Sequence, residues 1–214
     1  TYNTAFMKFS ELDYEVASNS FDKYLQRFET GIFRIDATYY NAISLLKIGD
    51  TATAILNYQK IVKSNSSSHK ENSLIFLARR SYNADDYEKS NIYYTKLLDF
   101  ASSNSIKREI VIRLMTGNEH TDKIVALKYA AQVVEFEKID NWLLSKAYII
   151  IARDEFDSGN YAKSKSTFEI VSNLSFHDEG AEAKYYLAYL TYLDEDFLLA
   201  EQLIFALAEH YSND

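Results

Sequence analysis

Apolar residues recur along the whole chain at the three- and four-residue intervals typical of amphipathic helices. One stripe runs through Ala54, Tyr58 and Ile61, and another begins at Ala200 and continues through Ile204. Short polar segments rich in Ser and Asn separate the stripes, and such residues favour turns. They include residues 64–68, 102–105 and 172–175. The pattern predicts an all-α protein with twelve main helices in six antiparallel pairs.

Two small residues stand twelve positions apart within each predicted pair of helices. The pairs are Ala5/Ala17, Ala42/Ala54, Ala78/Ser90, Ala152/Ser164 and Ala188/Ala200, with Leu114/Ala126 as a degenerate sixth. Their second members lie at 17, 54, 90, 126, 164 and 200, so the unit repeats every 36 to 38 residues. Small side chains on both helices let the two axes cross closely, and repeating that crossing buries a core between neighbouring units.

A polar residue marks the expected start of the second helix in every unit. It stands four positions before the second small residue, at Asp13, Asp50, Asp86, Asp122, Asn160 and Asp196. The side-chain oxygen of Asp or Asn accepts a hydrogen bond from a backbone N–H that the first turn of a helix leaves unpaired. Gly49 and Gly159 directly precede two of these residues, where a tight turn is expected.

Composition excludes several classes of protein. Hydrophobic residues make up 47% of the 214 residues and charged residues 25%, as in ordinary folded proteins. No apolar run approaches the roughly 20 residues of a membrane-spanning helix. The net charge of −8 disfavours nucleic acid as a partner, because phosphates bind basic surfaces. The absence of proline suits helices, and the absence of cysteine excludes disulfides and thiolate metal sites.

The period and register resemble the tetratricopeptide repeat (TPR) family over essentially the whole chain. Asp86 to Ser90 with Tyr94, and Asn160 to Ser164 with Phe168, match the family pattern best. The resemblance implies a right-handed α/α superhelix, or solenoid, of six helix–turn–helix repeats in one domain, residues 1–214. The approximate repeats are 1–33, 34–69, 70–105, 106–142, 143–178 and 179–214.

Several positions depart from the family pattern. Every unit lacks the closing proline, and the only Trp is Trp142, between two repeats. Curvature is therefore not inferred from the family, because larger residues replace the third small residue of the pattern. These are Tyr24, Ile61, Leu97, Val133, Val171 and Leu207. The fourth unit is the least regular: Leu114 replaces Ala, and the polar stretch from Thr116 to His120 predicts a shortened first helix.

The resemblance also implies a function, namely a non-catalytic scaffold that binds a protein or peptide partner. Within the family, the sequence most resembles bacterial envelope-assembly members, of the outer-membrane assembly lipoprotein or Tol–Pal coordinator type. We therefore expect a bacterial protein of the periplasm or outer membrane in preference to the cytoplasm. Because the chain starts at Thr1, we expect a segment of a longer protein or a mature chain.

Candidate chemistry is sparse. The four histidines, His69, His120, His177 and His210, fall at predicted loops or helix ends and are expected to be exposed to solvent. Acidic clusters coincide with predicted helix caps, and no phosphate-binding loop, nucleophile elbow or zinc motif occurs. The sequence thus predicts no catalytic residue, metal or cofactor. The alternative is a small-ligand-binding α-solenoid or a helical-repeat enzyme.

In this family the concave groove is lined by the first helix of each repeat. Carrying that geometry over nominates Tyr39, Asn72, Arg79, Tyr82, Arg108, Lys146, Arg153, Phe156, Tyr185, Tyr189 and Tyr192. Tyr and Arg are common in binding hot spots. One interpretation is a groove with a basic floor and aromatic walls that holds an acidic segment. The other is that the basic residues pair with neighbouring acidic residues and the tyrosines pack between repeats.

The ends of the array carry one more expectation. Helical repeat arrays usually need a polar capping element at each end. No further helix follows the last predicted one, so we expect exposed apolar surface at one or both ends. That surface would be covered by another molecule, by further chain or by self-association.

Overall fold

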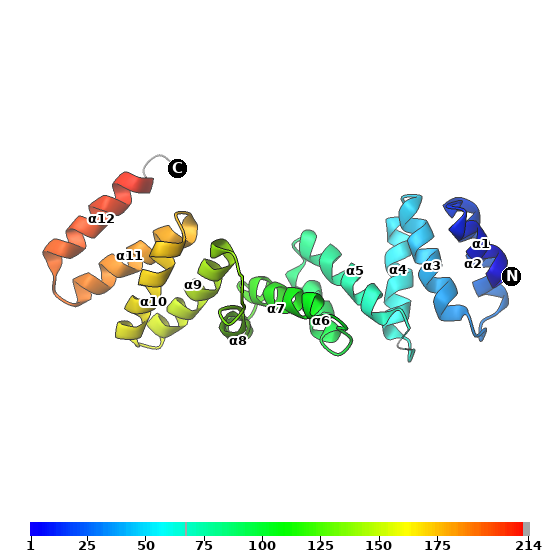
Figure 1. The fold of residues 1–214 in the computed structure, drawn as a ribbon, viewed down its shortest axis with the longest axis horizontal. Helices are drawn as coiled ribbons and strands as arrows, with labels where there is room; N and C mark the ends of the chain where they lie inside the picture. The colour runs from blue at the N-terminus through cyan, green and yellow to red at the C-terminus, as the bar shows by residue number, and fades with distance from the viewer. Residues whose placement is uncertain (67, 212–214) are drawn as a thin grey trace. The chain divides into compact units, whose positions relative to one another are not determined.

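The computed structural model describes residues 1–66 and 68–211, which form helices and no strand. The predicted all-α class with twelve helices is confirmed over these residues (Figure 1). The first helices of the six pairs are α1 (Tyr2–Ser10), α3 (Arg34–Lys47), α5 (Lys70–Asn83), α7 (Asn104–Asn118), α9 (Asn141–Asp157) and α11 (Asp178–Leu193). The second helices are α2 (Tyr14–Arg27), α4 (Thr51–Lys63), α6 (Tyr87–Leu97), α8 (Lys123–Val133), α10 (Tyr161–Leu174) and α12 (Phe197–Tyr211).

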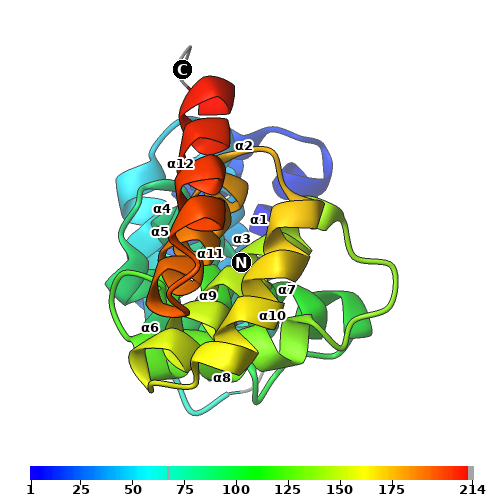
Figure 2. The same ribbon diagram turned by 90° about the vertical axis from the view of Figure 1, so that its left-hand side faces the viewer.

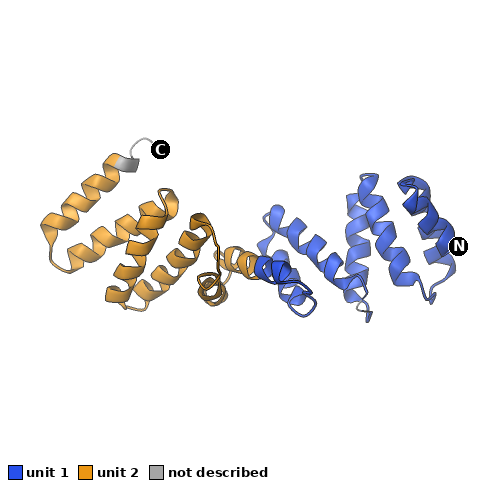
Figure 3. Cartoon of the chain, in the orientation of Figure 1, with its two compact units in different colours: residues 1–110 blue, residues 111–214 orange. Residues whose placement is uncertain are grey.

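The chain divides into two compact units, coloured separately in Figure 3. Unit 1 comprises Thr1–Ile110, with α1 to α6 and the first part of α7. Unit 2 comprises Val111–Asp214, with the rest of α7 and α8 to α12. Inside each unit the helices pack in chain order, α1 to α5 on their successors in unit 1 and α8 to α11 on theirs in unit 2.

The pairs of small residues lie in the buried part of the fold, as expected for residues at a helix crossing. All twelve side chains are buried, including Leu114 in the degenerate pair. Where the second member is Ser, its hydroxyl reaches the partner helix: Ser90 Oγ and Ser164 Oγ each donate to a main-chain oxygen 3.3 Å away, on Ala78 and Ala152. A larger side chain at these positions would separate the helices and break that hydrogen bond.

The predicted caps precede the second helix in all six repeats. Asp13, Asp50, Asp86, Asp122 and Asp196 each accept a hydrogen bond from a main-chain N–H in the first turn. Asn160 also stands directly before α10, although its side chain makes no capping hydrogen bond. These caps fix where the second helix of each pair begins.

In five of the six repeats, the residue directly before the cap has the left-handed backbone conformation. Two of these residues are the predicted turn glycines, Gly49 with φ +92° and Gly159 with φ +77°. Leu12, Asp85 and Glu195 occupy the same position with φ of 62°, 55° and 63°. The turn is therefore a property of the repeat, and it recurs where no glycine is present to ease it.

The first helix of the fourth repeat, α7, is not shortened, so the prediction of a shortened helix is wrong. α7 has 15 residues and runs through the polar stretch as far as Asn118. The polar side chains bond back to the preceding turn: Thr116 Oγ1 donates to Ile112 O at 3.1 Å, and Asn118 Nδ2 donates to Leu114 O at 2.7 Å. These bonds satisfy the polar groups without ending the helix.

Candidate functional site

The nominated groove residues all lie on the first helices of their pairs, but in two separate units. Unit 1 holds Tyr39 on α3, Asn72, Arg79 and Tyr82 on α5, and Arg108 on α7. Unit 2 holds Lys146, Arg153 and Phe156 on α9, and Tyr185, Tyr189 and Tyr192 on α11.

A hollow of about 480 Å³ lies along α5 in unit 1, which we call the α5 hollow. It brings together two nominated residues, Asn72 and Arg79, with further residues of α5 and with Ala84. Its lining consists of Asn72, Ile75, Phe76, Arg79, Arg80, Asn83 and Ala84. The lining therefore combines two amide side chains, two guanidinium groups and apolar side chains.

A second hollow, of about 470 Å³, lies between α11 and α12 in unit 2, and we call it the α11/α12 hollow. It brings together the nominated Tyr185, Tyr189 and Tyr192. Its lining is completed by Ala188, Phe197, Ala200, Glu201 and Ile204. This surface is almost wholly aromatic and aliphatic, with a single acidic group.

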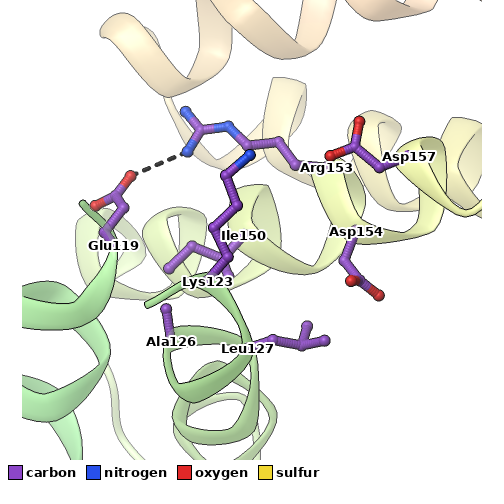
Figure 4. A pocket seen from close by; sticks show the side chains of 8 residues that line it. All are labelled: Glu119, Lys123, Ala126, Leu127, Ile150, Arg153, Asp154 and Asp157. Atoms are coloured by element: carbon purple, nitrogen blue, oxygen red, sulfur yellow. Dashed lines mark hydrogen bonds and ion pairs between the residues drawn. The ribbon is translucent and has the colours of Figure 1, made fainter. Parts of the chain in front are cut away.

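A small hollow of about 70 Å³ borders Arg153 (Figure 4). It lies among α8, α9 and the residue that follows α7, and its other lining residues are Glu119, Lys123, Ala126, Leu127, Ile150, Asp154 and Asp157. Figure 4 shows the guanidinium of Arg153 directed toward Glu119. This volume is well below the roughly 300 Å³ of a typical small-molecule site.

Arg153 is held by two carboxylates. Its Nε and Nη2 donate to Glu182 on α11 at 2.6 and 2.5 Å, and its Nη1 donates to Glu119 at 3.0 Å. The hydrogen bonds to Glu182 raise the pKa of Arg153 further above its ordinary value, and Glu119 adds to the effect. The group is therefore a bridge between neighbouring helices of unit 2.

Arg79 and Lys146 are also paired. Arg79 donates to both carboxylate oxygens of Glu109, at 2.7 and 2.5 Å. Lys146 Nζ lies 2.6 Å from Glu179 Oε1. For these residues and for Arg153, the structure shows the pairing with neighbouring acidic residues that the second interpretation describes. Pairing alone does not test whether the same side chains also bind a partner.

Arg80 is a basic residue that sequence reasoning missed. It lines the α5 hollow and is exposed, and no ion pair holds it among the described residues. The internal register selected its neighbour Arg79, because Arg79 matches Arg153 in the repeat. The sequence alone does not show whether an arginine side chain is exposed and lacks an acidic partner.

Several nominated aromatic residues pack inside their unit. The Tyr39 ring stacks on the His69 ring with centroids 4.0 Å apart, and His69 Nε2 lies 2.8 Å from Asp36 Oδ1. Burial raises the pKa of Tyr39. Tyr82 contacts Tyr87 at 5.3 Å.

The aromatic residues of unit 2 divide into two groups. The Phe156 ring lies 4.9 Å from that of Tyr186, on the next helix pair. Tyr185, Tyr189 and Tyr192 remain 51%, 41% and 56% exposed. Of the nominated aromatic residues in unit 2, these three leave the most surface open to contact another molecule.

The expected exposure of the histidines holds for two of them. His120 and His177 are exposed, but the side chain of His69 is only 19% accessible, so that expectation is wrong for His69. The side chain of His210 lies outside the described residues. Within the described part of the chain, no cluster of three or more His, Asp or Glu side chains is arranged to hold a metal ion. No described helix is both long and apolar enough to cross a membrane.

No model of a known protein family matches the chain, and no curated protein matches it significantly. Solved structures do match. YrrB, described as a TPR protein with an unusual peptide-binding site, is 17% identical, with 91% of this chain and 94% of YrrB covered and a TM-score of 0.56. The chain has the tetratricopeptide-repeat fold.

Two further structures with this fold support the assignment. Pseudomonas aeruginosa PilF is 14% identical, with 100% of this chain and 91% of PilF covered and a TM-score of 0.51. The C-terminal part of a TPR repeat-containing protein from Cytophaga hutchinsonii is 14% identical, with 100% and 80% covered and a TM-score of 0.50. At these identities the likeness shows the TPR fold alone. The narrower resemblance to envelope-assembly members stays a prediction.

The Lys146–Glu179 pair is expected to make part of the stability of the TPR fold dependent on pH. Burial by itself would raise the pKa of Glu179, but the hydrogen bond from Lys146, a main-chain hydrogen bond and the nearby positive charge together outweigh burial, so the pKa lies below the ordinary value. A carboxyl with a lowered folded-state pKa stabilises the fold above about pH 4.5, and that contribution is lost as pH falls through the folded-state pKa. Glu179→Gln should therefore reduce the free energy of unfolding at pH 7 by roughly 1.5 kcal/mol.

Urea unfolding followed by circular dichroism between pH 3 and pH 7 would measure this effect. The difference between wild type and Glu179→Gln should shrink toward pH 3. The exposed Glu169, whose side chain makes no hydrogen bond among the described residues, provides a matched control as Glu169→Gln. A constant difference at every pH would show that the variant acts through packing and not through charge.

Proposed function

We propose that this chain is a non-catalytic protein-interaction scaffold that binds a peptide or helical segment of a partner protein on the first helices of its repeats. The TPR fold supports this proposal, because stacked helical repeats form an extended surface from equivalent helices, and such surfaces bind other proteins. YrrB, which has the same fold, is described as having a peptide-binding site. The small hollow beside Arg153 gives no comparable support to a small-ligand site.

The observation that carries the proposal is the lining of the α5 hollow. Asn72 and Asn83 are exposed, and an amide side chain can both donate to and accept from the main chain of an extended peptide. Ile75 and Phe76 supply apolar contact area between them. Arg80 supplies a positive charge that no acidic side chain neutralises among the described residues. The surface therefore fits an extended segment with an acidic and an apolar residue.

Arg80 is the residue to test, because the paired basic residues are poor probes of binding. Replacing Arg153 would leave Glu119 and Glu182 without their shared partner, and the loss of stability would obscure any loss of affinity. Arg80→Glu reverses a positive charge at an exposed site that forms no ion pair with any described residue.

Arg80→Glu is expected to weaken peptide binding by about tenfold, the cost of one charge-assisted hydrogen bond. A displayed library of random 12-residue peptides would be selected on the full chain. Fluorescence anisotropy would then measure the selected peptides on wild type and variant. Acidic residues should be enriched among them.

Lys23→Glu is the matched control, since Lys23 is an exposed residue on α2 outside the α5 hollow. It should leave affinity within about twofold, because Lys23 does not line the hollow and an exposed charge is screened by salt. Equal losses in both variants, or no loss in Arg80→Glu, would contradict the α5 hollow as the binding surface. A library that yields no binding peptide would contradict the scaffold itself.

A further inference from the structure

The last pair of helices exposes an apolar surface that no described helix covers. Tyr192 and Phe197 are 56% and 57% exposed, and Ile204 on the floor of the α11/α12 hollow is 43% exposed. Figure 2 looks at unit 2 from this side, and α12 stands in front of α11. An apolar hollow of about 470 Å³ in this position calls for a partner of defined chemistry.

The preceding repeat shows what such a surface accepts. Moving each residue of the α11/α12 hollow back by one repeat of 36 positions gives the corresponding surface of α9 and α10. That surface is covered by α11 itself. The Tyr186 ring of α11 stacks on Phe168 at 4.7 Å and meets Phe156 at 4.9 Å. The natural occupant of this surface is therefore an amphipathic helix that inserts an aromatic side chain.

Charges at the covered surface determine the charges of its occupant. Arg153 on α9 pairs with Glu182 of the incoming helix. Lys165 Nζ on α10 lies 2.7 Å from Asp194 Oδ2, at the end of that helix. A basic surface residue thus meets an acidic residue at each of the two places.

The residues at both of these positions are different on the uncovered surface of α11 and α12. One repeat further on, Tyr189 stands where Arg153 stood, and Glu201 stands where Lys165 stood. The first change removes the need for an acidic residue in the occupant. The second reverses the sign, so that the end of the incoming helix must carry a basic residue. Among the described residues, no ion pair neutralises Glu201.

We propose that the α11/α12 hollow binds an amphipathic helix of another protein. The helix presents an aromatic side chain to Tyr192 and Ile204, and its C-terminal end carries a Lys or Arg that pairs with Glu201. Its residue facing Tyr189 is uncharged. This surface lies in unit 2 and takes a basic helix, whereas the α5 hollow of the proposed function lies in unit 1 and takes an acidic segment.

A second copy of this chain fits the α11/α12 hollow poorly. The repeat register aligns α1 with α11, so that Asn3 would stand where Tyr186 inserts its ring, and Glu11 would stand where Asp194 lies. Docking through α1 would then bury an amide and place Glu11 against Glu201. Two like charges at this position are unfavourable.

The test uses the full chain and two labelled peptides with the sequence of residues 178–194. The basic-end peptide carries Glu182→Leu and Asp194→Lys, and the acidic-end peptide carries Glu182→Leu alone. Fluorescence anisotropy at low salt should show the basic-end peptide binding about fivefold more tightly, and 1 M salt should remove the difference. Glu201→Lys in the chain should reverse the preference, so that the acidic-end peptide binds more tightly.

Two further variants separate docking from general effects. Ile204→Asp places a charge on the floor and should weaken both peptides at least tenfold, roughly the cost of burying an unpaired polar group. Glu169→Lys changes charge on an exposed site of α10 outside the hollow and should leave the preference unchanged. Circular dichroism would confirm that each variant keeps its helicity.

Three outcomes would overturn the proposal. The peptides could bind equally to wild type and to Glu201→Lys, which would remove the charge pairing. Their binding could be unaffected by Ile204→Asp, which would place them elsewhere. Sedimentation could show a dimer that Ile204→Asp dissociates and that the basic-end peptide does not, which would make a second copy the occupant. Loss of peptide binding by Arg80→Glu would leave this proposal untouched, because it concerns another surface.

Discussion

Replacing Phe168 with Ala is expected to reduce the free energy of unfolding of this chain by about 3–5 kcal/mol. The Phe168 side chain is fully buried on α10, and its ring stacks almost parallel on that of Tyr186, at an interplanar angle of 4°. Truncation therefore leaves a cavity between two successive helix pairs. In a repeat array, stability is approximately the sum of repeat and interface terms, so the loss should be concentrated in unit 2.

Urea unfolding followed by the fluorescence of Trp142, which lies in unit 2, would measure the loss, and hydrogen exchange would locate it. Exchange should rise most for the amides of α10 to α12. Phe205→Ala is the matched control: the ring of Phe205 is 63% exposed, so its removal should change stability by less than about 0.5 kcal/mol. Similar losses in the two variants would mean that the stacking of α11 on α10 contributes little.

The helix pairs were predictable from the sequence because their determinants are local. An Asp such as Asp86 caps a turn three residues away, and Ala78 meets Ser90 only twelve positions along the chain. Each of the six units repeats the same two signals, so an exception in one did not obscure the pattern. The apolar surface expected at an end of the array likewise follows from the pattern, and the structure places it on α11 and α12.

The error in α7 came from judging a polar stretch by composition. Thr116 and Asn118 have side chains that can accept or donate within the helix as well as in a turn. Whether they end the helix depends on the packing around them, and here Leu114 and Met115 are fully buried in the same turn. Burial of these two residues stabilises the helix beyond what the polar residues would allow alone.

The ion-pair partners of the nominated basic residues could not be predicted from the sequence. Arg153 meets Glu182 and Glu119, which are 29 and 34 residues away, and Arg79 meets Glu109 across 30 residues. Each partner stands on a neighbouring helix pair, and no repeated signal marks it. Pairing therefore depends on side-chain geometry between repeats, which also explains why sequence reasoning missed Arg80, a residue without an ion pair to any described side chain.

Gly180 presents a second case that sequence reasoning passed over, because a glycine in the first turn of a helix looks dispensable. Helix propensity alone would favour alanine there by about 1 kcal/mol. The structure predicts the opposite sign. A Cβ built on Gly180 would lie 1.9 Å from the main-chain oxygen of Ser175, the C-cap residue that follows α10. The connection between the fifth and sixth helix pairs folds back onto α11 at this point.

Gly180→Ala should therefore destabilise the chain by about 3 kcal/mol or more, since the backbone of Ser175 must move to admit the methyl group. Gly159→Ala is the control that separates a clash from conformational strain. A Cβ at Gly159 meets no atom within 4 Å, but its φ of +77° disfavours alanine, so the loss there should be about 1 kcal/mol. Thermal and urea unfolding of both variants would compare the two costs. If Gly180→Ala proved neutral or stabilising, propensity would outweigh the contact, and the close approach of Ser175 to α11 would not be a constraint on this fold.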